Sequence, residues 1–362
     1  MKNQQVLISG ASIAGLTAAW WLQHVGYQVT VVELATTPRT NGAAVDLNEE
    51  TVSIAKRMGL YEKLQAHHLG VDRIEYKNAA DITEGMMAIP SRSDELELER
   101  DKFVSVLMAE LGNVEFLFSN SISRLVEQAD GIKVFFKQGE PRGFDLVIGA
   151  DGAHSGTRKL WFGPEKDYAH FLGAYFSISI VSKTLVLQRT MQTFSVPYKS
   201  VMLNAYNGKT DIIFMFLAEE IAYDYRDMAA QRQIIAKQFA DEAWRVPELL
   251  AEVSQADFYF DQFCQIKMPS WSKGRVVLIG DAAYCLSPAA GQGGSLAMQG
   301  AAALADALAK HSDYAIAFSD YEQALRDTIE EVQEMAEQNM KTHFILTTDE
   351  DIRRRNTEAK LF

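Results

Sequence analysis

The chain has 362 residues and a mass of 40.4 kDa, and its 48% hydrophobic and 23% charged residues lie close to the average for globular proteins. This composition excludes a collagen, a coiled coil or a wholly disordered chain, and the length predicts two domains or one large fold. The chain carries 35 Lys and Arg against 48 Asp and Glu, a formal net charge of −13, so its surface repels phosphate backbones and we expect no nucleic-acid partner.

The cysteine and histidine content argues against two further classes of site. Only Cys264 and Cys285 occur, without a CxxC pair, which argues against a disulfide framework and fits a reducing compartment. The seven histidines form no HExxH or similar pair, so we expect no metal. No signal-peptide pattern is seen, and no apolar stretch approaches the ~20 residues of a membrane span. We therefore expect a cytoplasmic monomer with no membrane partner.

The first elements along the chain are predicted to be a strand, a glycine-rich turn, a helix and a second strand. An apolar run covers residues 6–10, a helical pattern follows over 11–26, and a second β pattern covers 27–33. Two further short apolar runs that end in Gly, over 145–149 and 276–280, are typical of strands covered on both faces. We therefore predict one parallel sheet whose strands are separated by long insertions.

The stretch 171–217 has a different pattern, which predicts an antiparallel sheet. It is rich in β-forming residues, and Asn207-Gly208 stands between two strands as a type I′ hairpin signal. Inserted into a nucleotide-binding sheet, such a region is expected to cover a substrate. The segments that could line its pocket contribute five apolar side chains: Phe214, Met215, Phe216, Phe258 and Phe260. Core burial is the more common fate of such residues, but an aromatic-lined pocket would suit a flat or polycyclic substrate. Farther on, residues 321–340 predict an amphipathic packing helix with an acidic outer face.

A nucleotide-binding motif begins at the first turn. Gly10-Ala11-Ser12-Ile13-Ala14-Gly15 stands between the first strand and the first helix, and Glu33 ends the second strand. The first Gly allows the tight turn, the last lets the helix approach the strand, the helix N-terminus offers amides to a pyrophosphate, and the acid binds ribose hydroxyls. Ser12 replaces the usual middle Gly, and its hydroxyl could itself donate to a phosphate. Glu33 would repel a 2′-phosphate, which favours the adenosine of FAD or NAD over that of NADP.

Two later motifs also follow strands. Asp151-Gly152 follows the run 145–149 and, by itself, is a common turn. The run 276–280 leads into Asp281, then Pro288 and the glycine-rich 291–294, which open a helix over about 295–310. An Asp at the C-terminal end of a strand, beside a helix N-terminus, can bind both a polyol and negative charge. Flavin offers both groups, in its ribityl chain and in a ring that becomes anionic on reduction.

In this order and spacing the three motifs resemble those of the group A flavoprotein monooxygenases, the para-hydroxybenzoate hydroxylase superfamily. The resemblance runs from Val6 to about Lys310 and looks closest to the tetracycline-modifying and polyketide-hydroxylating members. It implies an α/β fold: a Rossmann-like FAD-binding domain of the GR2 type, an inserted antiparallel β-sheet substrate domain and a C-terminal helix. The expected FAD-binding domain covers 1–75, 101–170 and 265–312, the substrate domain 76–100 and 171–264, and the C-terminal helix and tail 313–362.

The resemblance also implies which residues hold the cofactor. It places Gly10, Ser12, Ile13, Ala14, Gly15 and Glu33 at the FAD adenosine and pyrophosphate. Asp151 and Gly152 match a motif associated with both FAD and NAD(P)H, and Asp281 matches the aspartate on the ribityl chain. The residues that would line the isoalloxazine ring are Pro288, Gly291, Gly293 and Gly294.

Three charged positions carry over from the same family. Arg39 matches an arginine implicated in binding reduced nicotinamide, Asp46 an aspartate near the flavin, and Arg100 an arginine that contacts FAD. Arg100 also stands where a helix is expected to begin after a strand, as the family has it. The chain departs from many relatives at Tyr284, where they have a His, and this change could alter the surroundings of the ring.

The activity implied by the resemblance is oxygen insertion. NADPH or NADH reduces the FAD, O2 adds at the flavin C4a, and the resulting hydroperoxide gives one oxygen atom to an aromatic or polycyclic substrate. No catalytic base can be named from the residues, and hydroxylation and Baeyer–Villiger oxidation both remain open. The alternatives are a flavin oxidoreductase without oxygen insertion, such as a reductase or halogenase, and a non-catalytic flavin- or ligand-binding protein. The Trp-x-Trp-x-Ile-Pro signature of flavin-dependent halogenases is absent from the sequence.

Overall fold

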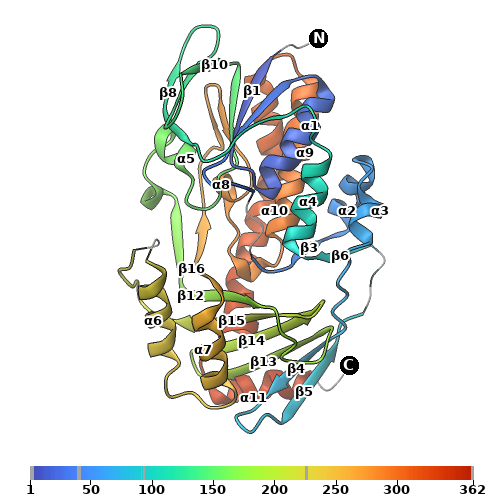
Figure 1. The fold of residues 1–362 in the computed structure, drawn as a ribbon, viewed down its shortest axis with the longest axis vertical. Coiled ribbons are helices and arrows are strands. Elements are labelled where there is room, and N and C mark those ends of the chain that lie inside the picture. The colour runs from blue at the N-terminus through green and yellow to red at the C-terminus, as the bar shows by residue number, and fades with distance from the viewer. Residues whose placement is uncertain (1–3, 39–41, 91, 93, 225–226, 360–362) are drawn as a thin grey trace.

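The computed structural model describes residues 4–38, 42–90, 92, 94–224 and 227–359. Two large sheets lie one above the other in Figure 1, joined by the long, bent strand β12. The upper sheet is surrounded by helices α1, α4, α9 and α10, and the lower sheet has α6 and α7 beside it. The mixed α/β architecture expected from the sequence is confirmed.

The upper sheet has six strands in the order β17-β18-β11-β1-β2-β7, and all neighbours are parallel except β17 and β18. Its strands are β1 (Gln5–Ser9), β2 (Gln28–Val32), β7 (Glu115–Leu117), β11 (Leu146–Gly149), β17 (Ser272–Lys273) and β18 (Val276–Leu278). The predicted runs near residues 6, 28, 146 and 276 are therefore neighbours in one sheet. Their side chains are almost completely buried, as strands covered on both faces require.

The helices that cover this sheet belong to both ends of the chain. Helix α1 packs against α9 and α4, and α9 packs in turn against α10. The helices of this half are α1 (Ile13–Val25), α2 (Glu49–Arg57), α3 (Tyr61–Gln65), α4 (Arg100–Ala109), α5 (Gly156–Trp161), α8 (Asp281–Tyr284), α9 (Gly293–Lys310) and α10 (Tyr314–Asn339). The expected C-terminal helix is longer than predicted, because Asp313 caps the N-terminus of α10 by accepting from the Ala315 amide.

Two small sheets flank the large one, and the sequence did not indicate either. An antiparallel three-stranded sheet contains β8 (Ile122–Glu127), β9 (Ile132–Phe136) and β10 (Arg142–Phe144). A two-stranded ribbon pairs β3 (Val45–Leu47) with β6 (Leu96–Leu98). This ribbon carries Asp46 and leads directly into α4, so it connects two of the expected cofactor positions.

The lower sheet has seven strands in the order β16-β12-β15-β14-β13-β4-β5. These strands are β4 (Arg73–Lys77), β5 (Thr83–Ala88), β12 (Ala169–Val181), β13 (Thr190–Val196), β14 (Lys199–Tyr206), β15 (Lys209–Leu217) and β16 (Asp257–Ile266). All pairs are antiparallel except β13 with β4, which run parallel. The predicted hairpin is confirmed: Asn207 and Gly208 have φ of 46° and 75° between β14 and β15, as a type I′ turn requires.

The two faces of the lower sheet carry different side chains. Phe214 and Phe216 belong to a core cluster with residues of α6 (Met228–Gln238) and α7 (Val246–Gln255), and so does Phe260. Phe258 packs against the same cluster, whereas Met215 belongs to the core shared with the upper sheet. Strand alternation explains the split, because residues one apart point to opposite faces. Of the five expected pocket residues, Phe214, Phe216 and Phe260 therefore fill a core and Met215 faces the upper half, whereas Phe258 both packs against that core and lines a pocket described below.

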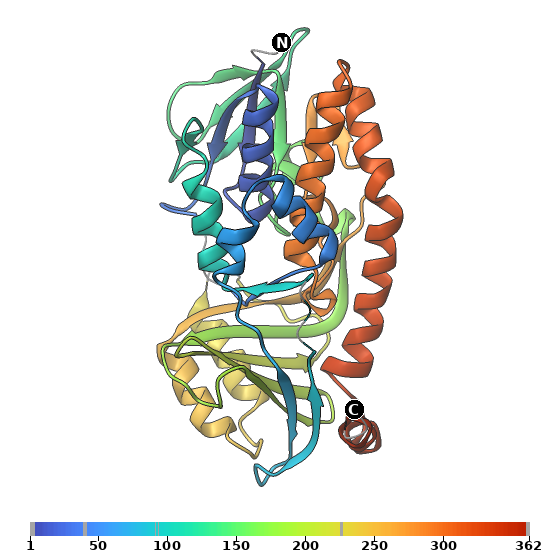
Figure 2. The same ribbon diagram turned by 90° about the vertical axis from the view of Figure 1, so that its right-hand side faces the viewer.

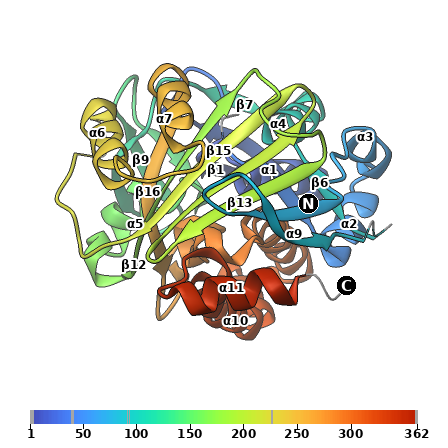
Figure 3. The same ribbon diagram turned by 90° about the horizontal axis from the view of Figure 1, so that it is seen from below.

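The C-terminal segment passes along the molecule and crosses under it. Helix α10 runs from the upper half towards the lower sheet, and α11 (Asp349–Glu358) lies across the bottom (Figures 2 and 3). A Cβ at Gly85 of β5 would lie 1.9 Å from the Asn356 carbonyl oxygen, so α11 is seated closely on the strand. In the part of the chain that the structure describes, no helix is both long and apolar enough to cross a membrane. The boundaries at residues 75/76, 100/101, 170/171, 264/265 and 312/313 remain a prediction.

Candidate functional site

The turn before α1 depends on its two glycines. Gly10 has φ of +105°, and a Cβ there would lie 2.5 Å from the Ala150 carbonyl oxygen. A Cβ at Gly15 would lie 2.0 Å from the Gly10 carbonyl oxygen. Any larger residue would push α1 away from the strand ends, so this closely packed turn requires Gly at both positions.

Ser12 caps α1, and its hydroxyl is used within the protein. It donates to the Ala150 carbonyl oxygen at 2.8 Å and accepts from the Gly15 amide at 3.1 Å. Its one proton is engaged by Ala150 in this structure, so the expectation that this hydroxyl donates to a phosphate stays a prediction that requires the proton to change partner. The amides of Ile13 and Ala14 open the helix, where no carbonyl within the helix can accept from them. They leave positive partial charge at this end of α1.

Glu33 follows β2 and is oriented by two backbone amides. Ala11 donates to Oε2 and Ala35 donates to Oε1, each at 2.8 Å. A carboxylate has about four acceptor positions, so both oxygens keep capacity for hydroxyl donors. The contact with Ala11 joins the acid to the glycine turn, which is the arrangement expected for a ribose-binding acid.

Asp151 follows β11 and accepts four hydrogen bonds from its own chain. Its Oδ2 accepts from the Thr157 amide and hydroxyl, both at 2.9 Å, and from the Ser9 hydroxyl at 3.4 Å, while Oδ1 accepts from Ser155. These bonds hold the start of α5 against β1. Gly152, with φ of +83° and open space around its Cα, lets the chain turn there. The side chain of Asp151 is thus an organising group at the strand ends.

Asp281 opens the short helix α8 at the end of β18. Its side chain is exposed, yet the surrounding protein desolvates it enough to raise its pKa, while the positive charge of Arg100 opposes the rise. Asp281 and Arg100 are the first residues of α8 and α4, and the charge effect joins these two helix starts.

The glycine-rich loop before α9 is built against the ribbon that carries Asp46. Pro288 lies in the short 3-10 helix η2 (Pro288–Ala290), Gly291 ends it with φ of +67°, and Gly293 begins α9. A Cβ at Gly294 would lie 2.0 Å from Cγ1 of Val45. The neighbouring Ser295 donates to the Asp46 carbonyl oxygen at 2.8 Å. The third motif and the Asp46 segment are therefore one unit in space.

Asp46 is a carboxyl group that titrates near neutrality. It stands directly opposite Glu97 in the register of β3 and β6. Although the Asp46 side chain is exposed, desolvation by the surrounding protein, and then the charges of Glu97 and Glu95, raise the pKa of Asp46 to about 7. Burial also raises the pKa of Glu97. Asp46 can therefore hold a proton at neutral pH, beside the loop where the resemblance places the flavin ring.

A pocket of about 340 Å³ separates Arg100 from the lower sheet. Gly42, Glu99 and Arg100 line one side, and a Cβ at Gly42 would lie 3.2 Å from Cδ of Arg100. Ile178 and Ile180 of β12 line the sheet side. The aromatic residues Tyr206, Phe258 and Tyr259 also line the pocket, so of the expected aromatic lining residues Phe258 is confirmed. Arg39, the expected nicotinamide-binding arginine, lies outside the described residues.

The sequence analysis missed several polar residues of this pocket. Lys209 forms ion pairs with Glu99 and Asp101 at 2.5 and 3.8 Å, and Tyr206 donates to Asp211 at 2.6 Å. Tyr206 and Lys209 flank the turn of the predicted hairpin, so their proximity could have been predicted from the sequence. Their approach to Glu99, more than a hundred residues away, depends on how the two halves pack.

Tyr284 does not alter the surroundings of the loop in the way expected. Its ring is buried against Trp271 and Tyr321, and a Cβ at Gly300 would lie 1.9 Å from its hydroxyl oxygen. Tyr284 therefore packs between α8, α9 and α10. Tyr in place of the His of many relatives therefore changes the core behind the glycine-rich loop.

The residues of this region fit FAD. An open helix N-terminus beside Glu33 suits an adenosine diphosphate, and the exposed but partly desolvated Asp281 suits a polyol chain. The first two residues of α9, Gly293 and Gly294, carry no side chain, so a flat ring could approach the start of this helix closely. When bound, FAD would supply the electron transfer and oxygen activation, and the protein would hold and orient it.

Comparison with known proteins decides the family. The family described as FAD binding domain matches residues 3–318. The chain belongs to this family. It is 38% identical over 348 residues to an uncharacterized protein of Mycobacterium tuberculosis, covering 92% of this chain and 93% of that protein. It is 32% identical over 337 residues to a flavin-dependent monooxygenase of Legionella longbeachae, covering 91% and 87%.

A solved structure gives the same answer for the fold. The tetracycline destructase Tet(55) matches with a TM-score of 0.87 and 33% identity, covering 98% of this chain and 94% of that one. The flavoprotein is therefore an FAD-dependent monooxygenase that acts on a small molecule with O2. The expected superfamily, fold class and FAD cofactor are confirmed.

Proposed function

We propose that this monooxygenase consumes NADPH or NADH and inserts one oxygen atom of O2 into an aromatic or polycyclic molecule bound in the 340 Å³ pocket. The observation that carries the proposal is the position of Arg100. It lines the pocket on one side and acts electrostatically on Asp281 on the other. A substrate in this pocket would lie next to the group held by Asp281, as oxygen transfer requires.

The cofactor assignments belong to this proposal. Backbone amides at the start of α1, with Gly10, Ser12, Ile13, Ala14 and Gly15, would bind the pyrophosphate, and Glu33 the ribose. Asp281 would bind the ribityl chain, and Pro288, Gly291, Gly293 and Gly294 would border the ring. Asp46 and Arg100 would approach the flavin from the ribbon and from α4. Asp151 and Gly152 would act chiefly by shaping the strand ends, since Asp151 is engaged internally.

The site for the reductant and the assembly state are proposed from the sequence. Arg39 stays our candidate for reduced nicotinamide, and Arg39→Ala should raise KM for NADH or NADPH while FAD stays bound. Unchanged reduction kinetics would make Arg39 a solvated surface charge. We also propose that the enzyme works as a cytoplasmic monomer.

The pocket favours a flat or compact ring system. Its volume lies near the lower end of the ~300–1,000 Å³ that ligand pockets usually enclose. Ile178 and Ile180 offer an apolar floor, and Arg100, Lys209 and three carboxylates surround it. Because the tetracycline destructase Tet(55) shares 33% identity, a tetracycline belongs in the first substrate panel beside simpler aromatic and polyketide compounds.

The experiment combines a spectrum with turnover. The purified protein is expected to show flavin absorbance, to oxidise NADH or NADPH, and to take up oxygen faster with one member of the panel. Mass spectrometry should find a product heavier by one oxygen atom. Substrate-stimulated NAD(P)H oxidation without such a product would favour a reductase. Bound FAD with no oxidation of either nucleotide under any ligand would favour a binding protein.

A further inference from the structure

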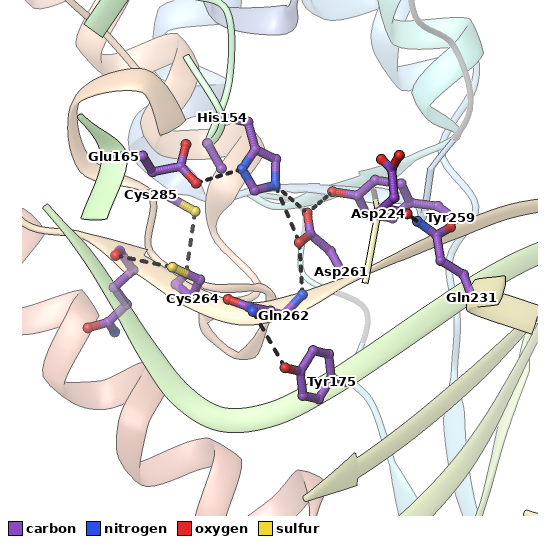
Figure 4. Close-up of polar contacts among 12 residues, drawn as sticks. His154, Glu165, Tyr175, Asp224, Gln231, Tyr259, Asp261, Gln262, Cys264 and Cys285 are labelled. Atoms are coloured by element: carbon purple, nitrogen blue, oxygen red, sulfur yellow. Dashed lines mark hydrogen bonds and ion pairs between the residues drawn. The ribbon is translucent and has the colours of Figure 1, made fainter. Parts of the chain in front are cut away.

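A network of four ionisable side chains connects the two halves of the molecule at the substrate pocket (Figure 4). Tyr259 lines the pocket and donates its hydroxyl proton to Oδ2 of Asp261 at 2.5 Å. Both residues lie on β16, two apart, and therefore share one face of the sheet. The register places Tyr259 beside Ile178 and Asp261 beside Phe176, which belong to or pack against the core shared with the upper half.

Asp261 is held from the other half of the molecule by His154. Nε2 of His154 lies 3.3 and 3.4 Å from the two Asp261 oxygens, and Nδ1 lies 2.9 Å from Oε1 of Glu165. The Gln262 amide also donates to Asp261 at 2.8 Å. With a carboxylate at each ring nitrogen, His154 binds its second proton firmly: the hydrogen bonds that it donates to Asp261 and Glu165 raise its pKa to about 10. His154 is therefore an imidazolium at neutral pH.

The positive charge on His154 determines the protonation state of the Asp261 carboxyl group. Burial alone would raise the pKa of this carboxyl, but hydrogen bonds and charge from His154, together with the Tyr259 hydroxyl, outweigh it and lower the pKa. Asp261 is therefore an ionised acceptor. A phenol has a single proton, and that of Tyr259 is directed to this carboxylate. Towards a group that enters the pocket, the Tyr259 oxygen can act only as an acceptor.

A second tyrosine on the pocket wall is also paired with an aspartate. Tyr206 lines the pocket and donates to Asp211, but burial raises the pKa of Asp211 to about 7, so this pair lacks the fixed ionised acceptor that Asp261 provides for Tyr259. The acidic residues Glu99, Asp101 and Asp257 outnumber the basic Arg100 and Lys209 among the lining residues. Since Lys209 pairs with Glu99 and Asp101, the feature that sets Tyr259 apart in this lining is its acceptor oxygen beside Ile178 and Ile180.

We propose that Tyr259 is a specificity-determining residue, whose oxygen accepts a hydrogen bond from a hydroxyl group of the substrate. Asp261 and His154 are positioning residues, which keep the Tyr259 proton turned away from the pocket. The proposal rests on the proposed function, because it takes the 340 Å³ pocket as the substrate site. It predicts that a hydroxylated ring binds in preference to its methyl ether, which cannot donate.

The test measures binding to the FAD-loaded enzyme without any nicotinamide, so that its result does not depend on turnover. Equilibrium dialysis compares matched pairs: 1-naphthol with 1-methoxynaphthalene, 2-naphthol with 2-methoxynaphthalene, and 1,8-dihydroxyanthraquinone with 1,8-dimethoxyanthraquinone. We expect the wild type to prefer the hydroxyl member of at least one pair by about tenfold, the size of one hydrogen bond in a dry site. In Tyr259→Phe the ratio should fall to about one, through weaker binding of the hydroxyl member.

Two further variants test the positioning role of Asp261 and provide a control for the loss of a tyrosine hydroxyl. In Asp261→Asn the side-chain amide can donate to the Tyr259 oxygen and release its proton into the pocket, so the ratio should fall through tighter binding of the ether. Tyr175→Phe is the matched control: Tyr175 accepts from the Ile221 amide at 2.7 Å and packs with Phe216 and Phe260 on the opposite sheet face, so its loss should leave the ratio unchanged. Thermal melting and FAD content show that each variant is folded.

Three results would overturn the proposal: a wild type that binds both members of every pair equally, a wild type that binds neither member of any pair, and a Tyr259→Phe variant that keeps the preference. A failure here with intact substrate-stimulated oxygen uptake would leave the monooxygenase function standing. A clear hydroxyl preference without oxygen uptake would instead contradict the proposed reaction while supporting the role of Tyr259.

Discussion

At the scale of single residues, the site depends on carboxylates whose surroundings give them different states. Asp281 is exposed and faces the charge of Arg100, Asp261 is kept ionised by His154, and Asp46 titrates near pH 7 beside Glu97. The same functional group can thus serve as a polyol acceptor, an anchor for a tyrosine proton, or a group that changes charge at neutral pH. What separates these roles is the number of donors and charges around each carboxyl.

Asp281→Ala should weaken FAD binding, because it removes a charged acceptor for ribityl hydroxyls. The expected loss is roughly 1.5–3 kcal/mol, or about 10- to 100-fold in Kd. Titration of the apoprotein with FAD, followed by flavin fluorescence, measures it. The control is Asp306→Ala. Asp306 lies farther along α9, and its exposed carboxylate pairs with Arg57 of α2. Equal FAD affinity in wild type and Asp281→Ala would remove Asp281 from the cofactor site.

At the scale of elements, the start of α9 and the β3–β6 ribbon position one another. Gly294 leaves no room for a side chain beside Val45, and Ser295 bonds the backbone of the ribbon at Asp46 and Asn48. The loop expected at the flavin ring and the strand that carries Asp46 should therefore move together.

Gly294→Ala should separate α9 from the ribbon, since its Cβ would lie 2.0 Å from Cγ1 of Val45. We expect a melting temperature lower by several degrees, the shift that ~1–3 kcal/mol of overpacking causes, together with weaker FAD binding. Gly293→Ala is the matched control, because a Cβ there meets no atom within 4 Å. The double variant Gly294→Ala/Val45→Ala should recover part of the loss. Equal melting temperatures for the two single variants would refute the close packing.

At the scale of the whole molecule, the acidic residues at the junction of the two halves should make stability depend on pH. Asp211 is almost completely buried and accepts from Tyr206. Burial raises its pKa to about 7, against the opposing hydrogen bond of Tyr206 and with further increases from Glu97 and Glu99. In the unfolded chain the same group titrates near pH 4.

The sign of the effect follows from proton binding. Between about pH 4 and pH 7 the folded protein holds the Asp211 proton and the unfolded chain does not, so the free energy of unfolding falls as pH rises through this window. Asp211→Asn removes this contribution, and its melting temperature relative to wild type should increase from pH 5 to pH 8. Asp306→Asn, at an exposed site, should show no such trend. A constant difference between Asp211→Asn and wild type would show that Asp211 is ionised throughout.

The local elements and the cofactor class could be predicted from the sequence. The turn at Gly10, the hairpin at Asn207 and the helix start at Arg100 depend on neighbouring residues, whose backbone preferences act over a few positions. The motif order then indicated the FAD-binding monooxygenase superfamily. The β3–β6 pairing and the small β8–β10 sheet escaped prediction, because polar residues interrupt these short strands, which lack the continuous apolar runs that marked β11 and β18.

The sequence by itself determined the short apolar strands and the glycine turns, because each is encoded by contiguous residues with particular conformational needs, and the resemblance of its three motifs to a known superfamily indicated the FAD cofactor. Only the tertiary structure decided which sheet face borders the 340 Å³ pocket: it placed Phe214, Phe216 and Phe260 in the core with α6 and α7, while Phe258 lines the pocket. It also brought His154 to Asp261 across 107 positions of the chain. Strand register and the packing of the two halves make such contacts, and both depend on the whole chain at once.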